Sequence, residues 1–322
     1  MKDIYYIINK NLIVKKFFTK CKRVFYIIYT QIFFALERNA MNKEENKFLM
    51  EMAGKIRIDI VEMLCESGSG HSGGSLSLAD VFAYLYFSGA LKLDPKNPSM
   101  KDRDRIVLSK GHACPVLYAT LAEKGYFDKA HLRTLRKFGS ILQGHPDMKK
   151  TPGIDMTTGS LGQGLSCAVG MALGARLDKL GCNVFAIVGD GECDEGQIWE
   201  AAMAAAHYRL DNLIVILDRN GLQIDGYTKD IMNTEPMIDK WKSFGWEVIE
   251  INGHDLDEID RAITKAIDFN GKPVCIVANT IKGKGVSFME DRCEWHGKTP
   301  SPEEKEKAIG EICYFISKTP SE

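Results

Sequence analysis

Two polar side chains follow two apolar segments, at the points where buried strands would end. The apolar run Val184–Val188 is followed by Asp190, which stands between two glycines, and the run Leu213–Leu217 is followed by Asn220. The residues between Asp190 and Asn220 leave room for a helical crossover, which returns the chain parallel to itself. Both strands then end at the same edge of a sheet, where ligands of open α/β sheets bind. One carboxylate, one amide oxygen and a loop carbonyl near Leu222 are hard ligands that suit Mg²⁺ or Ca²⁺ and leave positions for phosphate oxygens.

Histidines beside glycines form a second group of residues that could do chemistry. An imidazole serves as an acid, a base or a hydrogen-bond donor near neutral pH, and an adjacent glycine frees the backbone to aim it into a cleft. We expect His254, which also follows a glycine, to have a role in a turn, and His131 and His207 to be structural or exposed. The histidines that we expect to share one site are His71, His112, His145 and His296.

The segments that must position these residues alternate between apolar runs and helical periodicity. Continuous apolar runs, typical of strands that are covered on both faces, lie at Val184–Val188, Leu213–Leu217 and Pro273–Ala278, and the helical stretches Gln197–Tyr208 and Leu256–Phe269 separate them. Further elements are expected at Phe48–Glu66, Leu78–Phe87, Ile106–Leu108 and just after Gly159-Ser160. This alternation predicts an α/β fold with a doubly wound, mainly parallel sheet flanked by helices, and a single domain over residues 41–322.

Composition excludes several classes of protein. The 322 residues carry a formal net charge of −1, which argues against a nucleic-acid binder that works through a basic face. Hydrophobic residues make up 45% of the chain, as in ordinary globular proteins and unlike disordered or collagen-like chains. The nine cysteines form no Cys-x-x-Cys pair, so we expect free thiols in a reducing compartment and a cytoplasmic protein.

Residues 1–40 differ in composition from the rest of the chain. They hold eight basic and two acidic residues, a net charge of +6. Their longest apolar run, 24–36, falls short of the roughly 20 residues that a membrane-spanning helix needs. We expect a basic, apolar extension outside the fold, with Met41 as the working start. A membrane or export role is the alternative.

The motifs occur in an order that resembles the diphosphate-binding half of transketolase, over about residues 45–300. The matching strings are Gly70-His71-Ser72-Gly73, Arg103 to His112, Gly144-His145-Pro146, Thr157 to Gly164, Gly189-Asp190-Gly191 with Glu195-Gly196, Asp218-Arg219-Asn220, Thr280 to Gly285, and Trp295-His296-Gly297. The resemblance implies thiamine diphosphate and Mg²⁺ as cofactors, with Ca²⁺ or Mn²⁺ as possible substitutes. It also implies transfer of a two-carbon ketol unit from a ketose phosphate to an aldose phosphate.

The same resemblance assigns roles to individual positions. Asp190, Asn220 and the Leu222 carbonyl would bind the metal ion and, through it, the diphosphate. The phosphate end of the cofactor would lie against Gly191, His112, Lys282 and His296, and its two rings against Gly159 and Leu161. The substrate channel would be lined by His71, His112, His145 and His296 as proton carriers and hydroxyl donors.

Full-length transketolases carry two further domains, one of which holds the glutamate that activates the cofactor. The sequence is therefore most similar to the N-terminal subunit of a split transketolase. This implies that the partner is a separate C-terminal chain, with two copies of each chain in the assembly. One alternative is another thiamine diphosphate enzyme, including a transketolase for an unusual or sulfonated ketose. The other is a non-catalytic, cofactor-binding scaffold subunit.

Overall fold

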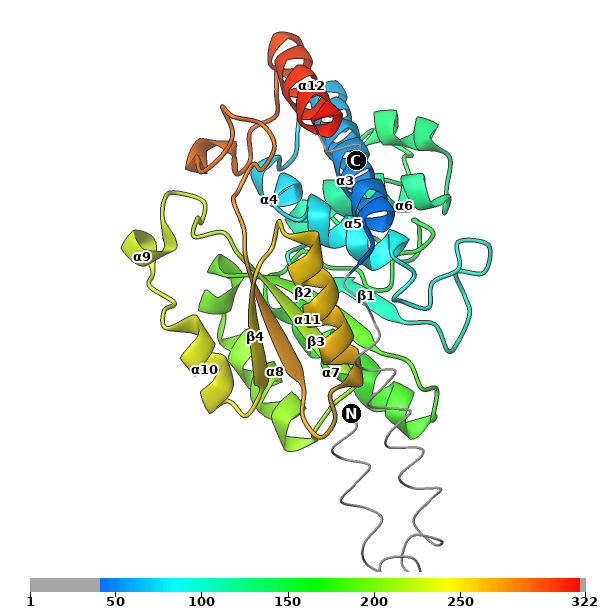
Figure 1. The fold of residues 1–322 in the computed structure, drawn as a ribbon, viewed down its shortest axis with the longest axis vertical. Coiled ribbons are helices and arrows are strands. Elements are labelled where there is room, and N and C mark those ends of the chain that lie inside the picture. The colour runs from blue at the N-terminus through cyan, green and yellow to red at the C-terminus, as the bar shows by residue number, and fades with distance from the viewer. Residues whose placement is uncertain (1–40, 319–322) are drawn as a thin grey trace, which may run out of the picture. The chain divides into compact units, whose positions relative to one another are not determined.

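A five-stranded, all-parallel sheet with the order β1-β2-β3-β5-β4 forms the centre of the fold (Figure 1). The structure is a computed structural model that describes residues 41–318. The strands are Arg105–Leu108 (β1), Val184–Gly189 (β2), Leu213–Arg219 (β3), Glu247–Asn252 (β4) and Val274–Asn279 (β5). The predicted parallel α/β sheet is therefore confirmed.

Helices connect the strands and cover both faces of the sheet. The α-helices are Lys43–Ser67 (α3), Gly73–Leu76 (α4), Ala79–Phe87 (α5), Cys114–Lys124 (α6), Gln163–Leu177 (α7), Gly196–His207 (α8), Thr228–Ile231 (α9), Met237–Ser243 (α10), Leu256–Asp268 (α11) and Pro302–Ser317 (α12). Short 3₁₀ turns lie at Gly111–Ala113, Lys129–Thr134, Gly191–Asp194 and Cys293–Trp295.

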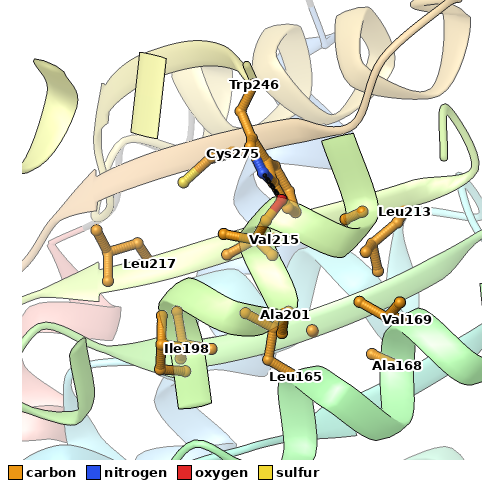
Figure 2. Close-up of a cluster of buried hydrophobic side chains, with 14 of the residues drawn as sticks. Leu165, Ala168, Val169, Ile198, Ala201, Leu213, Val215, Leu217, Trp246 and Cys275 are labelled. Carbon is orange, nitrogen blue, oxygen red and sulfur yellow. Dashed lines mark hydrogen bonds between the residues drawn. The ribbon is translucent and has the colours of Figure 1, made fainter. Parts of the chain in front are cut away.

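One face of the sheet packs against α7, α8 and α10. Successive side chains of a strand point to opposite faces, so alternate residues of β2, β3 and β5 reach this layer. Figure 2 shows side chains of α7 and α8 gathered against β3 and β5. The buried members labelled there are Leu165, Ala168, Val169, Ile198, Ala201, Leu213, Val215, Leu217, Trp246 and Cys275. This apolar layer anchors the strands whose polar ends form the site described below.

Helix α11 covers the other face over β4 and β5, α5 packs on α11, and α3 packs on α5 and α6. In Figure 1, α11 lies in front of the sheet, and α3 and α12 lie side by side above it. Helix α12 begins with a capping box, in which the Ser301 hydroxyl accepts a hydrogen bond from the Glu304 amide and the Glu304 carboxylate accepts one from the Ser301 amide. The packing of α12 on α3 joins segments that are distant in sequence.

The element boundaries differ from the predicted ones at a few points. The helix expected just after Ser160 begins at Gln163, because Gly162 adopts a left-handed conformation with φ of +81° and ends the preceding turn. Helix α3 begins five residues before the expected Phe48. Helices α10 and α12 were not expected from the sequence.

The prediction for residues 1–40 falls outside the described residues and stays untested. Within residues 41–318, none of the helices combines the length and the apolar character needed to traverse a bilayer. Eight cysteines lie in this part of the chain, and all are free thiols in the structure.

Candidate functional site

The ends of β2 and β3 bring Asp190 to the turn that contains Asn220. In the parallel register Gly189 pairs with Asp218, so the residues that follow the two strands leave the same edge of the sheet. The Asp190 carboxylate accepts hydrogen bonds from the backbone amides of Gly191 (2.8 Å) and Gly221 (2.6 Å). The predicted convergence of these two strand ends is present in the structure.

Asn220 is held by both ends of its amide group. Its Nδ2 donates to Asp218 Oδ2 at 3.0 Å, and its Oδ1 accepts from the Leu222 amide at 3.1 Å. The Leu222 carbonyl accepts a hydrogen bond from Lys282 Nζ at 3.1 Å. The third predicted metal ligand is therefore in contact with a cationic group of the chain itself.

Asp218 is a buried carboxylate that the sequence analysis did not single out. It forms a buried ion pair with Lys110 and accepts hydrogen bonds from the hydroxyls of Thr280 and of Ser77, the latter at 2.8 Å. Burial alone would raise the pKa of Asp218, but the Lys110 ammonium and these hydrogen bonds lower it overall. The position two residues before Asn220, on the same strand, was the signal that could have identified it.

Asp190 is compensated less strongly, by hydrogen bonds from two backbone amides. It is only 3% exposed, and no ion pair to it is found within residues 41–318. Burial, followed by repulsion from Asp218, raises the pKa of Asp190 to about 6. A buried carboxylate beside an amide oxygen and a carbonyl, without a cationic side chain paired to it, is a chemically suitable donor set for a divalent cation. The residues present therefore fit Mg²⁺.

Three of the predicted histidines form a triangle above this edge. The ring centroids of His71, His112 and His296 are 5.1 to 5.3 Å apart. Burial lowers their pKa values to about 4, about 2 and about 3 respectively, with nearby cationic side chains adding to the effect. All three rings are thus neutral near pH 7. His71 Nδ1 is buried and has no hydrogen-bond partner among residues 41–318, which leaves it available to a bound molecule.

Lys282 lies between the predicted metal ligands and the three histidines. Its Nζ is 2.9 Å from His296 Nδ1 and 3.4 Å from the Gln223 carbonyl, in addition to its contact with Leu222. Burial and the nearby Lys110 lower the pKa of Lys282 to about 8, so the side chain is still mostly protonated at pH 7. A buried ammonium at this point is suited to an anionic group such as a phosphate.

A cavity of about 290 Å³ joins these residues. All the predicted site residues line it except His145, whose ring instead lies beside Gly159. The lining residues among the predicted set are His71, His112, Gly159, Leu161, Asp190, Gly191, Asn220, Leu222, Lys282 and His296. Burial lowers the pKa of His145 as well. The structure therefore brings ten of the predicted residues to one cavity and leaves one beside it.

Glu192 is a further lining residue that the sequence analysis missed. Its carboxylate accepts hydrogen bonds from the Ser109 hydroxyl at 2.6 Å and from the backbone amides of Gly162 (2.8 Å) and Gly189 (3.1 Å). Glu192 thereby joins the end of β2 to the segments before α6 and α7. Its place directly after Asp190-Gly191 could have revealed it.

The chain is similar to known proteins over most of its length. Residues 49–312 match the family described as "Transketolase, thiamine diphosphate binding domain". The chain is 51% identical to the 6-deoxy-6-sulfo-D-fructose transketolase subunit SqwG of Clostridium sp. (strain MSTE9), over 84% of this chain and 98% of that protein. It is 45% identical to an apulose-4-phosphate transketolase subunit of Phocaeicola vulgatus, over 83% of this chain and 95% of that protein.

Solved structures of transketolases have the same fold. The crystal structure of transketolase from Campylobacter jejuni matches with a TM-score of 0.77 and 33% identity, over 85% of this chain and 43% of that one. The chain thus spans less than half the length of that transketolase. Together, the match to the domain family, the identity to two transketolase subunits and the shared fold establish that this chain belongs to the transketolase family, as its thiamine diphosphate-binding domain.

Proposed function

We propose that this chain is the N-terminal subunit of a two-subunit transketolase that uses thiamine diphosphate and Mg²⁺. The observation that carries the proposal is the cavity at the carboxyl edge of the sheet, where an uncompensated carboxylate, a buried ammonium and three neutral imidazoles meet. Two relatives named as transketolase subunits are matched over 95% and 98% of their own lengths, which supports a separate-subunit organisation.

Different residues at the carboxyl edge would bind the metal ion, the diphosphate and the rings of the cofactor. Asp190, Asn220 and the Leu222 carbonyl would hold the metal ion, and Lys282 would hold diphosphate oxygens once its ammonium leaves the carbonyl. Gly159 and Leu161 line the part of the cavity that would receive the rings of the cofactor. Thiamine diphosphate supplies, when bound, an electron sink for a two-carbon unit.

The histidines supply the acid–base groups. His71, His112 and His296 are neutral near pH 7, so each can accept a proton from a substrate hydroxyl at its unprotonated nitrogen and donate a hydrogen bond from its N–H to a carbonyl oxygen. The unpartnered Nδ1 of His71 provides a hydrogen-bonding position inside the site. The buried lining restricts water, which favours transfer of the carbon unit to a sugar over side reactions.

The proposed donor is a ketose with an uncommon substituent, and a sulfonated ketose such as 6-deoxy-6-sulfo-D-fructose is the first candidate. The sequence analysis placed an ordinary ketose phosphate first and an unusual or sulfonated ketose second. The identities favour the reverse order: 51% to the sulfofructose transketolase chain and 45% to the apulose-4-phosphate transketolase chain, against 39% to the transketolase of Rattus norvegicus.

The proposed partner is a C-terminal transketolase chain that contributes the activating glutamate. Reconstitution tests this: the full chain is purified with and without the C-terminal transketolase chain of the same genome, and ketol transfer to an aldose phosphate is measured. We expect activity only with both chains, Mg²⁺ and thiamine diphosphate, and the highest kcat/KM for the sulfonated ketose. Transfer at a normal rate by this chain alone would contradict the two-subunit proposal. A preference for a pentulose phosphate as donor would contradict the proposal that the donor is a sulfonated ketose.

A further inference from the structure

Lys282 lies on a segment, Thr280–Gly285, that is anchored by hydrogen bonds near both of its ends. The Thr280 hydroxyl donates to the Asp218 carboxylate, and the Gly283 amide donates to the Gly73 carbonyl at 3.0 Å. These bonds tie the segment to β3 and to the start of α4.

His254 contacts the same segment next to Lys282. Its Nε2 is 2.8 Å from the backbone nitrogen of Ile281, and its Nδ1 is 2.7 Å from Asp80 Oδ2. A backbone amide can only donate, so Nε2 must be the unprotonated acceptor, and a neutral ring then carries its proton on Nδ1 and donates it to Asp80. The two contacts select one tautomer and one orientation of the ring.

Arg57 completes the network. Its guanidinium binds both Asp80 oxygens, at 3.0 and 2.6 Å, and its Nε donates to the Lys284 carbonyl at 3.0 Å. Residues on either side of Lys282 are thus bound by one connected set of side chains: Ile281 by His254, and Lys284 by Arg57. Arg57 and Asp80 are both buried, so the pair is weakly screened by solvent.

The backbone before His254 keeps the ring in place. Gly253 donates its amide to the Asn279 carbonyl at 2.8 Å, and a Cβ at Gly253 would lie 2.5 Å from the Thr280 side chain. The turn therefore packs directly on the end of β5, where the Lys282 segment begins. The turn expected for His254 is present, but its side chain makes contacts that a turn does not require.

We propose that His254, oriented by Asp80 and Arg57, is a positioning residue that fixes the Lys282 segment so that the ammonium lies in the cavity. His254 is not among the described residues that line the cavity, and it contacts the Lys282 segment at the backbone of Ile281. A higher affinity for a diphosphate group would follow from this position of the ammonium, and that consequence rests on the proposed function. The positioning of the segment itself does not depend on the proposed function.

Two substitutions of His254 test its two hydrogen bonds separately. The side-chain amide of an asparagine lies about where Nδ1 lies in histidine, and the side-chain amide of a glutamine lies about where Nε2 lies. His254→Gln therefore keeps an acceptor for the Ile281 amide, while His254→Asn keeps only a donor for Asp80. His207→Asn on α8, whose ring contacts Tyr208, is the matched control.

Amide hydrogen exchange of residues 281–285 and the rate of Lys282 acylation are measured in the full chain without ligand, together with the urea midpoint. We expect both rates to rise about tenfold in His254→Asn and less than about twofold in His254→Gln and the control. In the active two-chain enzyme, the KM for thiamine diphosphate should rise in His254→Asn with kcat nearly unchanged.

Wild-type exchange and acylation rates in His254→Asn would overturn the proposal. So would a rise spread equally over β5 and α11 with a parallel fall in the urea midpoint, because that pattern indicates a purely structural role. If the wild-type pair of chains shows no ketol transfer, the proposed function fails, but the exchange and acylation results still decide the positioning role.

Discussion

Asp190 and Asp218 occupy the ends of adjacent strands, and both carboxylates are buried, yet they are compensated in different ways. Asp218 has its own cation in Lys110, and two hydroxyls donate to it. Asp190 receives hydrogen bonds from two backbone amides and has no cationic partner within residues 41–318. The pKa of Asp218 is accordingly lowered, while that of Asp190 is raised to about 6.

This contrast separates a structural ion pair from a binding site. A buried charge that is neutralised within the chain contributes to the fold, and its removal leaves its partner unpaired. A buried charge without an internal partner is stable only when the neutralising ion comes from elsewhere or when the group takes up a proton. Asp218 belongs to the first kind and Asp190 to the second, although they are neighbours on one edge.

The largest expected effect is on function, from Asp190→Asn. Ketol transfer by the two-chain enzyme should fall more than about 100-fold, because losing a metal ligand exceeds the 10–100-fold cost of losing an outer-sphere partner. The unfolding free energy should change by less than about 1 kcal/mol, since removal of an uncompensated charge offsets a weakened hydrogen bond. Steady-state assays and urea titrations measure the two effects, with exposed Asp230→Asn as the control. Unchanged activity would favour the scaffold alternative.

Asp218→Asn should give the opposite result for stability. Lys110 would be left as a buried, unpaired ammonium, so the unfolding free energy should fall by about 3–5 kcal/mol. Urea denaturation of the isolated chain measures this loss, and Lys110→Met in the same background should recover part of it by removing the unpaired charge. A loss no larger than that of Asp190→Asn would contradict the proposed difference between the two carboxylates.

Asp59 on α3 is a third buried carboxylate, and its contribution to stability depends on pH. It is 6% exposed, and its Oδ1 pairs with the half-exposed Lys129 at 3.0 Å, while its Oδ2 has no hydrogen-bond partner in the described part of the chain. Burial, which outweighs the Lys129 contact, raises the pKa of Asp59 to about 7. The folded state therefore holds this proton more tightly than the unfolded state, so its stabilising contribution is complete below about pH 4 and is lost as the pH rises through 7.

We expect the difference in unfolding free energy between the wild type and Asp59→Asn to decline by about 1–2 kcal/mol between pH 5 and pH 8, because the titrations of the other groups, including the histidines of the site, cancel in that difference. Urea midpoints at four pH values in this range provide the measurement. The pKa of the neighbouring Glu123 is lowered, so its contribution to the unfolding free energy rises with pH, but this rise occurs below pH 5. Parallel pH profiles for the variant and the wild type would show that Asp59 titrates normally.

The smallest effect should come from an exposed pair. Asp102 and Lys92 form a salt bridge in which both side chains are about half exposed. Water screens such a pair and the two long side chains lose freedom in forming it, so Asp102→Asn should leave the thermal midpoint within about 1 °C of the wild type. A shift as large as that of Asp218→Asn would mean that burial does not control how much these ion pairs contribute to stability.

The sheet and much of the site were predictable from the sequence. The runs that became β2, β3 and β5 are continuous and apolar because these strands are covered on both faces, and local residue order is sufficient to reveal that. Parallel crossovers then bring Asp190 and Asn220 to one edge by geometry alone. The glycines beside His71, His112 and His296 marked the imidazoles that share the cavity.

Other features depended on contacts between distant segments. His145 carries the same glycine signal as the other histidines but lies beside the cavity, because the packing of its loop against Gly159 sets its position. His254 has the sequence of a turn, and its second role depends on Asp80, 174 residues away. No local pattern encodes such a contact.

The order of apolar and polar residues by itself determined which segments became central strands, at which edge the ligating oxygens gather, and to which family the chain belongs. Only the tertiary structure decided how each buried charge is neutralised: Lys110 joins Asp218 across 108 residues, whereas no cationic side chain of the described residues forms an ion pair with Asp190. The physical reason is that periodicity and strand direction act over short stretches of chain. The electrostatic environment of a buried group is the sum over all segments that pack around it.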